Sequence, residues 1–249
     1  MSAVAATALA ALLAAAVPAV AMKRVPGGTY LPFYSLKDER PTPVAPFDLD
    51  ERPVTNAEYL EFVRAHPEWA RSRVPRLKAD EAYLSHWAGD LELGPDVAPE
   101  QPVTFVSWFA ATAYCRELGK RLPSEAEWEL AASPAGATAD EKGEAERRIL
   151  AFYARPRGLL PHAGDTPPNA YGVRDLYGVI WEWISDWGAS VMPVDPRAGA
   201  GGEDFCGGAA VASRAPESYS TFMRFAFRSS VEQRFALHHL GFRCARSAP

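Results

Sequence analysis

The chain has 249 residues, of which 48% are hydrophobic and 11% aromatic, and its formal net charge at neutral pH is −5. These totals allow a sizeable core in one large domain or two small ones. The acidic balance, with no basic stripe along the chain, argues against a nucleic-acid partner. The 22 prolines and 18 glycines are spread along the chain and favour many turns and short elements over a helical bundle.

The chain begins with a segment that is typical of export. An apolar run over residues 3–17 precedes Pro18 and the small-residue triplet Ala19-Val20-Ala21. We interpret residues 1–21 as a signal peptide cleaved after Ala21, which leaves 22–249 as the mature chain, free of the membrane and secreted or periplasmic. An uncleaved membrane anchor is the alternative, but the run is shorter than the roughly 20 residues that a span needs. Export would place the cysteines where they can pair.

Three helices are predicted from their end signals. Two residue pairs have the capping-box spacing at a helix start: Thr55 with Glu58, and Ser124 with Glu127. A further helix is predicted to begin after Ser107 and to end at Gly119, because glycine tolerates the positive φ of a helix end.

Two segments have the pattern of strands. Residues 101–107 (QPVTFVS) are rich in β-branched side chains. Residues 222–228 alternate between apolar and basic side chains, as a half-buried strand would. With no βαβ rhythm, the pattern predicts a loop-rich α+β chain.

The usual motifs of hydrolases, nucleotide-binding proteins and zinc proteases are absent: there is no GxSxG, GxxxxGK[ST], GxGxxG or HExxH. The acidic and aromatic segment 175–187 places three tryptophans within seven residues. One interpretation is core packing, with Glu182 held by hydrogen bonds. The other is that Glu182 and nearby carbonyl groups bind Ca²⁺, which prefers oxygen ligands.

Other candidates for chemistry lie near the C-terminus. His238 and His239 precede Cys244 and could ligate a transition metal, although adjacent residues on a strand point to opposite faces. Three arginines have apolar neighbours and would be either paired inside the fold or anchors for a bound peptide: Arg224, Arg228 and Arg243. Cys206, beside two glycines, is either a reactive thiol or a small residue in a turn.

Several segments, in order, resemble one known family. They are MKRVPGGTY (22–30), RPVTNAEYLEFV (52–63), YLSHW (83–87), QPVTFVSWFAATAYCRELGKRLPSEAEWELAA (101–132), NAYGVRDLYGVIWEWISDW (169–187) and LGFRCA (240–245). Together they resemble the formylglycine-generating enzyme, or sulfatase-modifying factor, family over essentially the whole mature chain. The resemblance implies a single α+β domain of that family's own fold, distantly like C-type lectins.

The resemblance also implies where the family's chemistry would lie. Its enzymes oxidise a sulfatase cysteine to formylglycine with O₂ and a copper ion held by two cysteines, in a pattern like GGSxxCxxxxC. In this chain those two positions correspond to Ala212 and Ser220. Without two thiolates there is no soft site for Cu(I), so we expect formylglycine generation to be absent.

The resemblance also bears on the remaining cysteines and on the acidic segment. The resemblance implies a disulfide between Cys115 and Cys244, which would close a loop of about 130 residues and stabilise by roughly 4–5 kcal/mol. Cys206 is then left without a partner. The family's calcium motif, GNxWEW, keeps its glycine and Glu182 here but has Val179 in place of asparagine. Calcium at Glu182 is therefore expected to bind more weakly than in the family.

The sequence leaves three functions open. The first is an exported factor for oxidative tailoring or maturation in a periplasmic system, with copper or iron on Cys206 or on His238 and His239, and with Ser220 and Arg224 as further catalytic candidates. The second is a non-catalytic module that binds a peptide or protein. The third is formylglycine generation, which would require Cys206 to replace a missing ligand.

Overall fold

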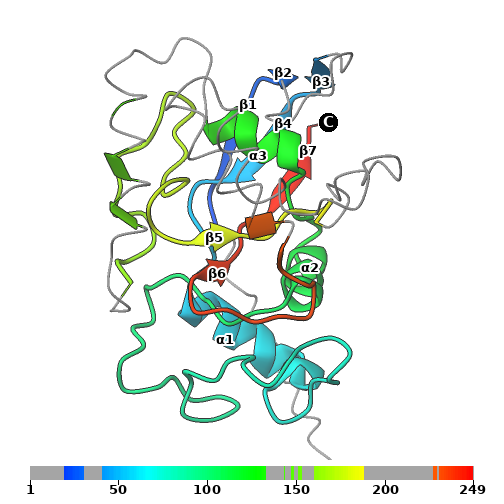
Figure 1. Cartoon of the computed structure of the whole chain (residues 1–249), viewed down its shortest axis with the longest axis vertical. Helices are drawn as coiled ribbons and strands as arrows, with labels where there is room; N and C mark the ends of the chain where they lie inside the picture. The colour runs from blue at the N-terminus through cyan, green and yellow to red at the C-terminus, as the bar shows by residue number, and fades with distance from the viewer. Residues whose placement is uncertain are drawn as a thin grey trace, which may run out of the picture.

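A computed structural model describes residues 20–30, 41–132, 143, 147–148, 151–152, 160–187, 227–228 and 230–248. Within them the fold is mixed α+β, as predicted, with three α-helices among short strands (Figure 1). The elements in chain order are β1 (Met22–Val25), β2 (Gly28–Tyr30), β3 (Thr42–Val44), β4 (Phe47–Asp50), α1 (Asn56–Ala65), η1 (Pro67–Trp69), α2 (Trp108–Glu117), α3 (Glu125–Ala132), β5 (Trp181–Glu182), β6 (Leu240–Gly241) and β7 (Ala245–Ser247).

The largest sheet brings the two ends of the mature chain together. Its strand order is β1-β4-β7, and both pairings are antiparallel. Leu49 in the central strand β4 lies opposite Lys23 on one side and Ala245 on the other. Figure 1 shows β1 in blue and β7 in red at the end of the molecule away from α1. The C-terminal strand is therefore an integral part of the fold.

The predicted helix starts are confirmed. The Thr55 hydroxyl accepts a hydrogen bond from the Glu58 N–H at 3.3 Å, and the Glu58 carboxylate accepts one from the Thr55 N–H at 2.8 Å. The same reciprocal pair joins Ser124 and Glu127, at 3.2 and 2.9 Å. Each box satisfies N–H groups that a helix start leaves without partners.

The helix between Ser107 and Gly119 is also confirmed. The Ser107 hydroxyl accepts from the Ala110 N–H, and α2 ends just before Gly119, whose φ is +64°. That conformation carries little strain only for glycine, which explains why the helix ends there.

Aromatic side chains dominate the core between α1 and α2. The Tyr59 ring stacks on Tyr114 at 5.9 Å between centroids and meets Phe242 and Trp87 edge-on at 6.1 and 6.2 Å. Its hydroxyl hydrogen-bonds the Tyr83 hydroxyl at 2.7 Å, so the buried polar tip has a partner. This cluster ties both helices to the C-terminal segment.

The strand predicted over residues 101–107 is wrong. Only an isolated bridge from Pro102 to Thr55 forms there. The N–H of Val103 donates to the Val54 carbonyl, whereas that of Phe105 donates to Leu237, so the segment has no single partner strand. The φ of Phe105 is +53°, which interrupts the extended backbone.

The strand predicted over 222–228 is wrong for the residues that the structure describes. Residues 222–226 lie outside the described part, and residues 227, 228 and 230 are helical. Arg228 is buried because it is paired with carboxylates, and not because it belongs to a strand whose side chains alternate between inside and outside.

Residues 1–19 also lie outside the described part, so the signal peptide stays a prediction. Among the helices that the structure describes, none has the length and apolar character needed to cross a membrane.

Candidate functional site

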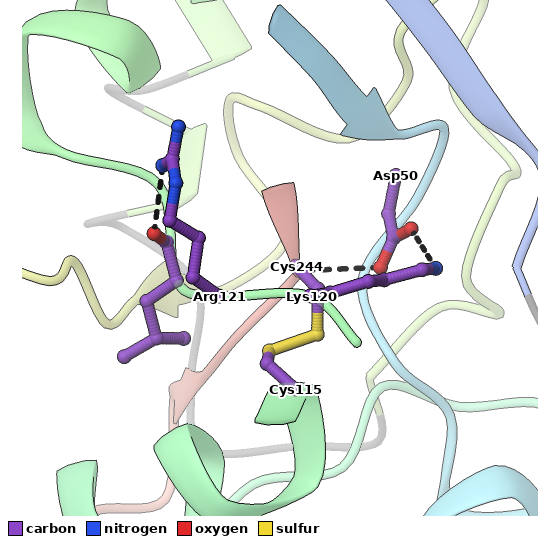
Figure 2. Close-up of a disulfide and its surroundings, with 6 residues drawn as sticks. Asp50, Cys115, Lys120, Arg121 and Cys244 are labelled. Carbon is purple, nitrogen blue, oxygen red and sulfur yellow. Dashed lines mark hydrogen bonds and ion pairs between the residues drawn. A yellow bond between two sulfur atoms is a disulfide. The ribbon is translucent and has the colours of Figure 1, made fainter. Parts of the chain in front are cut away.

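The disulfide implied by the family resemblance is present (Figure 2). Cys115 on α2 is bonded to Cys244, just before β7, across a sequence separation of 129 residues. Their Cα atoms lie 5.6 Å apart, and both residues are fully buried. The bond fastens the C-terminal strand to the middle of the chain.

A buried ion pair also fastens the C-terminal segment to the rest of the fold. The Lys120 ammonium donates to one Asp50 carboxylate oxygen at 2.6 Å, and the Cys244 N–H donates to the other at 2.9 Å (Figure 2). Burial raises the pKa of Asp50, and the neighbouring Lys120 only partly opposes that rise. Asp50 thus uses both oxygens to hold the disulfide region.

A second buried pair involves the predicted calcium residue. Arg243 donates to the two carboxylate oxygens of Glu182 at 2.7 and 2.8 Å, and the Trp128 indole N–H donates to one of them at 2.8 Å. The arginine also donates to the backbone carbonyls of Asp50 and Glu51. A calcium ion would have to compete with this guanidinium, so calcium at Glu182 stays a prediction that the geometry does not favour.

The tryptophans around Glu182 pack into the core, as one of the two interpretations expects. The indole N–H of Trp183 donates to the Val106 carbonyl at 2.8 Å, and that of Trp187 donates to the Val231 carbonyl at 2.7 Å. Their rings lie 4.3 Å apart between centroids. Because the polar tips are bonded, these large side chains can be buried without cost from unpaired N–H groups.

Arg228 is paired inside the fold, which confirms one of the two interpretations offered for the arginines. Its guanidinium donates to Glu125 at 3.0 Å and to Glu129 at 2.9 Å, both on α3. It also lies 5.3 Å from the centre of the Trp128 ring. Arg228 and Arg243 are thus structural charges, while Arg224 lies outside the described residues.

A narrow pocket adjoins these groups. Trp128, Trp181, Trp187 and Phe227 lie in its wall, with Arg228 and Glu182 beside them, and its volume is about 30 Å³. On this measure a cavity needs roughly 10–15 Å³ to hold one water, so the described residues leave space for about two.

The expectation for the two adjacent histidines is wrong. They lie in a turn instead of a strand, and their rings meet, with centroids 4.6 Å apart and Nδ1 atoms 2.6 Å apart. Both rings could therefore serve one site, in contrast to the alternation that a strand imposes. Metal binding by His238 and His239 stays a prediction.

Sequence reasoning missed a third histidine nearby. Both ring nitrogens of His86 are buried without a hydrogen-bond partner among the described residues. Burial, together with the positive charges of His238 and Arg71, lowers the pKa of His86 from 6.5 to about 4. Its ring packs on Phe105 with centroids 4.8 Å apart. No spacing in the sequence indicated this contact, because it joins two segments that are 19 residues apart in the chain.

Comparison with known proteins identifies the family. The model of the Sulfatase-modifying factor enzyme 1-like domain matches residues 11–248. The chain belongs to the sulfatase-modifying factor family. It is 32% identical to the formylglycine-generating enzyme of Streptomyces coelicolor, with 90% of this chain and 88% of that protein covered.

Two further relatives show the range of the family. The chain is 30% identical to the mouse protein named Inactive C-alpha-formylglycine-generating enzyme 2, with 92% of this chain and 86% of that protein covered. The solved structure of PvdO from Pseudomonas aeruginosa matches with a TM-score of 0.52 at 16% identity, over 94% of this chain and 97% of that one. The structural match supports the fold alone.

The cysteines do not fit the family's two-thiolate copper site. The chain contains three cysteines, and the disulfide uses two of them. Cys206 is the third, so a single chain can offer at most one thiolate to a soft metal ion. The candidates Cys206 and Ser220, and also Ala212, lie outside the described residues, and their roles stay predictions.

Proposed function

We propose that this member of the sulfatase-modifying factor family is exported and serves as a tailoring or maturation factor for a periplasmic system. It acts on a peptide or protein partner and does not generate formylglycine by two-thiolate copper chemistry. The observation that carries this proposal is the Cys115–Cys244 disulfide, which leaves one cysteine in the chain. Any oxidative step would therefore use copper or iron with other ligands, for which we propose Cys206 or the histidine pair 238–239.

A second candidate function is a non-catalytic binding module. It is supported by Glu182, whose carboxylate is already neutralised by Arg243 inside the core. Among the described residues, no group of three or more histidine, cysteine, aspartate or glutamate side chains is placed to hold a metal ion. The full-length likeness to a mouse protein named as inactive also agrees with such a role.

Metal loading and oxygen uptake separate these functions. The purified mature protein and its Cys206→Ser variant would be incubated with copper or iron, desalted, and analysed for bound metal. Oxygen uptake would be recorded with a cysteine-containing peptide, and the peptide would be examined for an aldehyde by mass spectrometry. Stoichiometric metal with oxygen uptake, both lost in C206S, would support the tailoring factor.

The other outcomes are equally informative. A protein that binds no metal beyond calcium and consumes no oxygen would favour the binding module. Conversion of the peptide cysteine to formylglycine would overturn both, since it would mean that one thiolate suffices for the family's reaction.

Export is tested separately, by N-terminal sequencing of the protein recovered from outside the cytoplasm. We expect a chain that begins at Met22, the first residue of β1. Recovery of an intact N-terminus would contradict cleavage.

A further inference from the structure

A short surface segment differs in charge from the rest of the chain. Residues 71–78 (RSRVPRLK) contain four basic side chains and no acidic one, whereas the whole chain carries a net charge of −5. The four are Arg71, Arg73, Arg76 and Lys78, and all are exposed. A compact positive cluster on an acidic protein favours partners of the opposite charge.

The segment is held in a defined shape. Two buried alanines flank it, Ala70 and Ala79, and the N–H of Ala79 donates to the Pro75 carbonyl within it. The Ser72 N–H and hydroxyl both donate to the Asp90 carboxylate, at 2.9 and 2.5 Å. These bonds fix the backbone from which the basic side chains project.

Two of the four basic side chains are used by the fold: Arg71 donates to the Trp87 carbonyl at 3.1 Å, and Lys78 lies over the Trp69 ring. Neither Arg73 nor Arg76 forms a salt bridge with any residue in the part of the chain that the structure describes. Between them and Lys78, the Leu77 side chain is 87% exposed. An exposed leucine alone is common. Beside the exposed basic side chains on a fixed turn, it offers a mixed apolar and basic contact.

A groove of about 470 Å³ adjoins this segment, between η1 and α2. Trp69 and Phe109 contribute aromatic walls, and Lys78 lies over the Trp69 ring at 5.1 Å from its centre. Phe109, Thr112 and Arg116 line it from one face of α2, as their spacing of three and four residues requires. Ligand sites of 300–1,000 Å³ with apolar walls are typical of proteins.

The groove itself carries charges of both signs. Arg116 and Lys78 stand on its edge with Glu68 and Glu117. The His66 ring lies between the two glutamates, 3.5 Å from one carboxylate and 3.3 Å from the other. The groove lining therefore holds two basic and two acidic side chains besides His66, and the excess of positive charge comes from residues 71–78 beside it.

We propose that residues 71–78 and this groove form a docking surface for an acidic segment of another protein. A bulky apolar side chain of the partner would enter between Trp69 and Phe109, while neighbouring carboxylates face Arg73, Arg76 and Lys78. The concave shape fits a peptide better than a flat lipid surface, and the net charge of −5 on the chain disfavours the long run of phosphates in a nucleic acid more than a short acidic segment. The inference holds whether the protein is a maturation factor or a binding module.

The test uses defined probes on the intact mature protein. Three dye-labelled peptides of equal length would be compared by fluorescence anisotropy: one with glutamate and phenylalanine, one with lysine and phenylalanine, and one with glutamate and serine. Anionic phospholipid vesicles and a single-stranded oligonucleotide would serve as the other polyanions. The variant is Arg73→Ser with Arg76→Ser. A control removes two exposed basic side chains on β1 and β7, away from α1 (Figure 1), Arg24→Ser with Arg246→Ser; because both pair with Asp48, urea unfolding first checks that each double variant is folded.

We expect the glutamate–phenylalanine peptide to bind most tightly, more weakly as salt is raised, and about tenfold more weakly to R73S/R76S than to the wild type. The control variant should bind like the wild type. The inference is overturned if no peptide binds, if the two double variants lose affinity equally, or if the vesicles or oligonucleotide compete with or exceed the acidic peptide.

Discussion

The buried C-terminal end of the chain and the exposed segment 71–78 use charge in opposite ways. Around Cys244, each of the ionic side chains Asp50, Lys120, Glu182 and Arg243 has a close partner within the fold. In residues 71–78, basic side chains project from a fixed turn without salt bridges to Arg73 or Arg76 among the described residues. The first arrangement stabilises the domain, and the second leaves charge available to a partner.

This difference affects how the family site is interpreted. Glu182 lies in an acidic and aromatic segment of the kind that suggests a metal site, yet its carboxylate is one of the charges that are paired inside the fold. A charged residue is a stronger functional candidate when the fold gives it no partner. Mutations at the two regions should therefore separate stability from binding.

The largest expected effect is loss of the disulfide. Replacing both cysteines, Cys115→Ser with Cys244→Ser, should lower the free energy of unfolding by about 4–5 kcal/mol, because the unfolded chain regains the entropy of a loop of about 130 residues. Urea unfolding of variant and wild type under non-reducing conditions measures this loss. The wild type in reductant is the matched control and should lose a similar amount. A loss below about 1 kcal/mol would mean that the disulfide does not anchor the C-terminal strand.

The next effect comes from breaking the buried ion pair. Glu182→Gln keeps the shape of the side chain but leaves the Arg243 guanidinium buried without its counter-charge, which should cost about 3 kcal/mol or more. The double variant E182M/R243M removes both charges and should recover much of that loss. Equal losses in the single and double variants would show that packing, not charge, is responsible. Calcium titration of the wild type, followed by thermal unfolding, tests the metal assignment in parallel.

A smaller effect depends on pH. Because the pKa of His86 is lowered to about 4 in the fold, the unfolded chain takes up a proton on this residue below pH 6.5 and the folded chain does not. Its contribution to stability is therefore present in full above pH 6.5 and is lost as pH falls toward 4. Between pH 7 and pH 5 we expect a loss of about 2 kcal/mol in urea unfolding. His86→Phe, which keeps a ring against Phe105, should remove this part of the pH dependence. An unchanged profile would contradict the assignment.

The smallest effect on stability is expected at the basic segment. Arg73→Ser with Arg76→Ser removes exposed side chains that form no salt bridge with the described residues, so the free energy of unfolding should change by no more than about 0.5 kcal/mol. Urea unfolding checks this directly. A large loss would show that the arginines support the fold and are not reserved for a partner.

Helix starts could be predicted from sequence because their signals are local. Thr55 with Glu58, and Ser124 with Glu127, satisfy each other within one turn, so spacing alone is sufficient. The strand over 101–107 could not be judged this way, since its backbone groups bond to two distant segments and Phe105 has a positive φ. The contact between His86 and Phe105 also joins separate segments, so spacing could not reveal it.

The candidate site was predictable to a similar extent. The disulfide followed from a family pattern, but the partners of Glu182 did not follow from its own segment. Arg243 lies 61 residues away in sequence and reaches Glu182 only because β5 and β6 pair in parallel. The role of a charged residue here depends on a distant partner.

A count of free thiols in the purified mature protein, under denaturing and non-reducing conditions, tests the central claim most directly. We expect one reactive thiol per chain, Cys206, because Cys115 and Cys244 are joined in a disulfide. Three thiols would contradict it, since the chain would then have further thiolates to offer a copper ion.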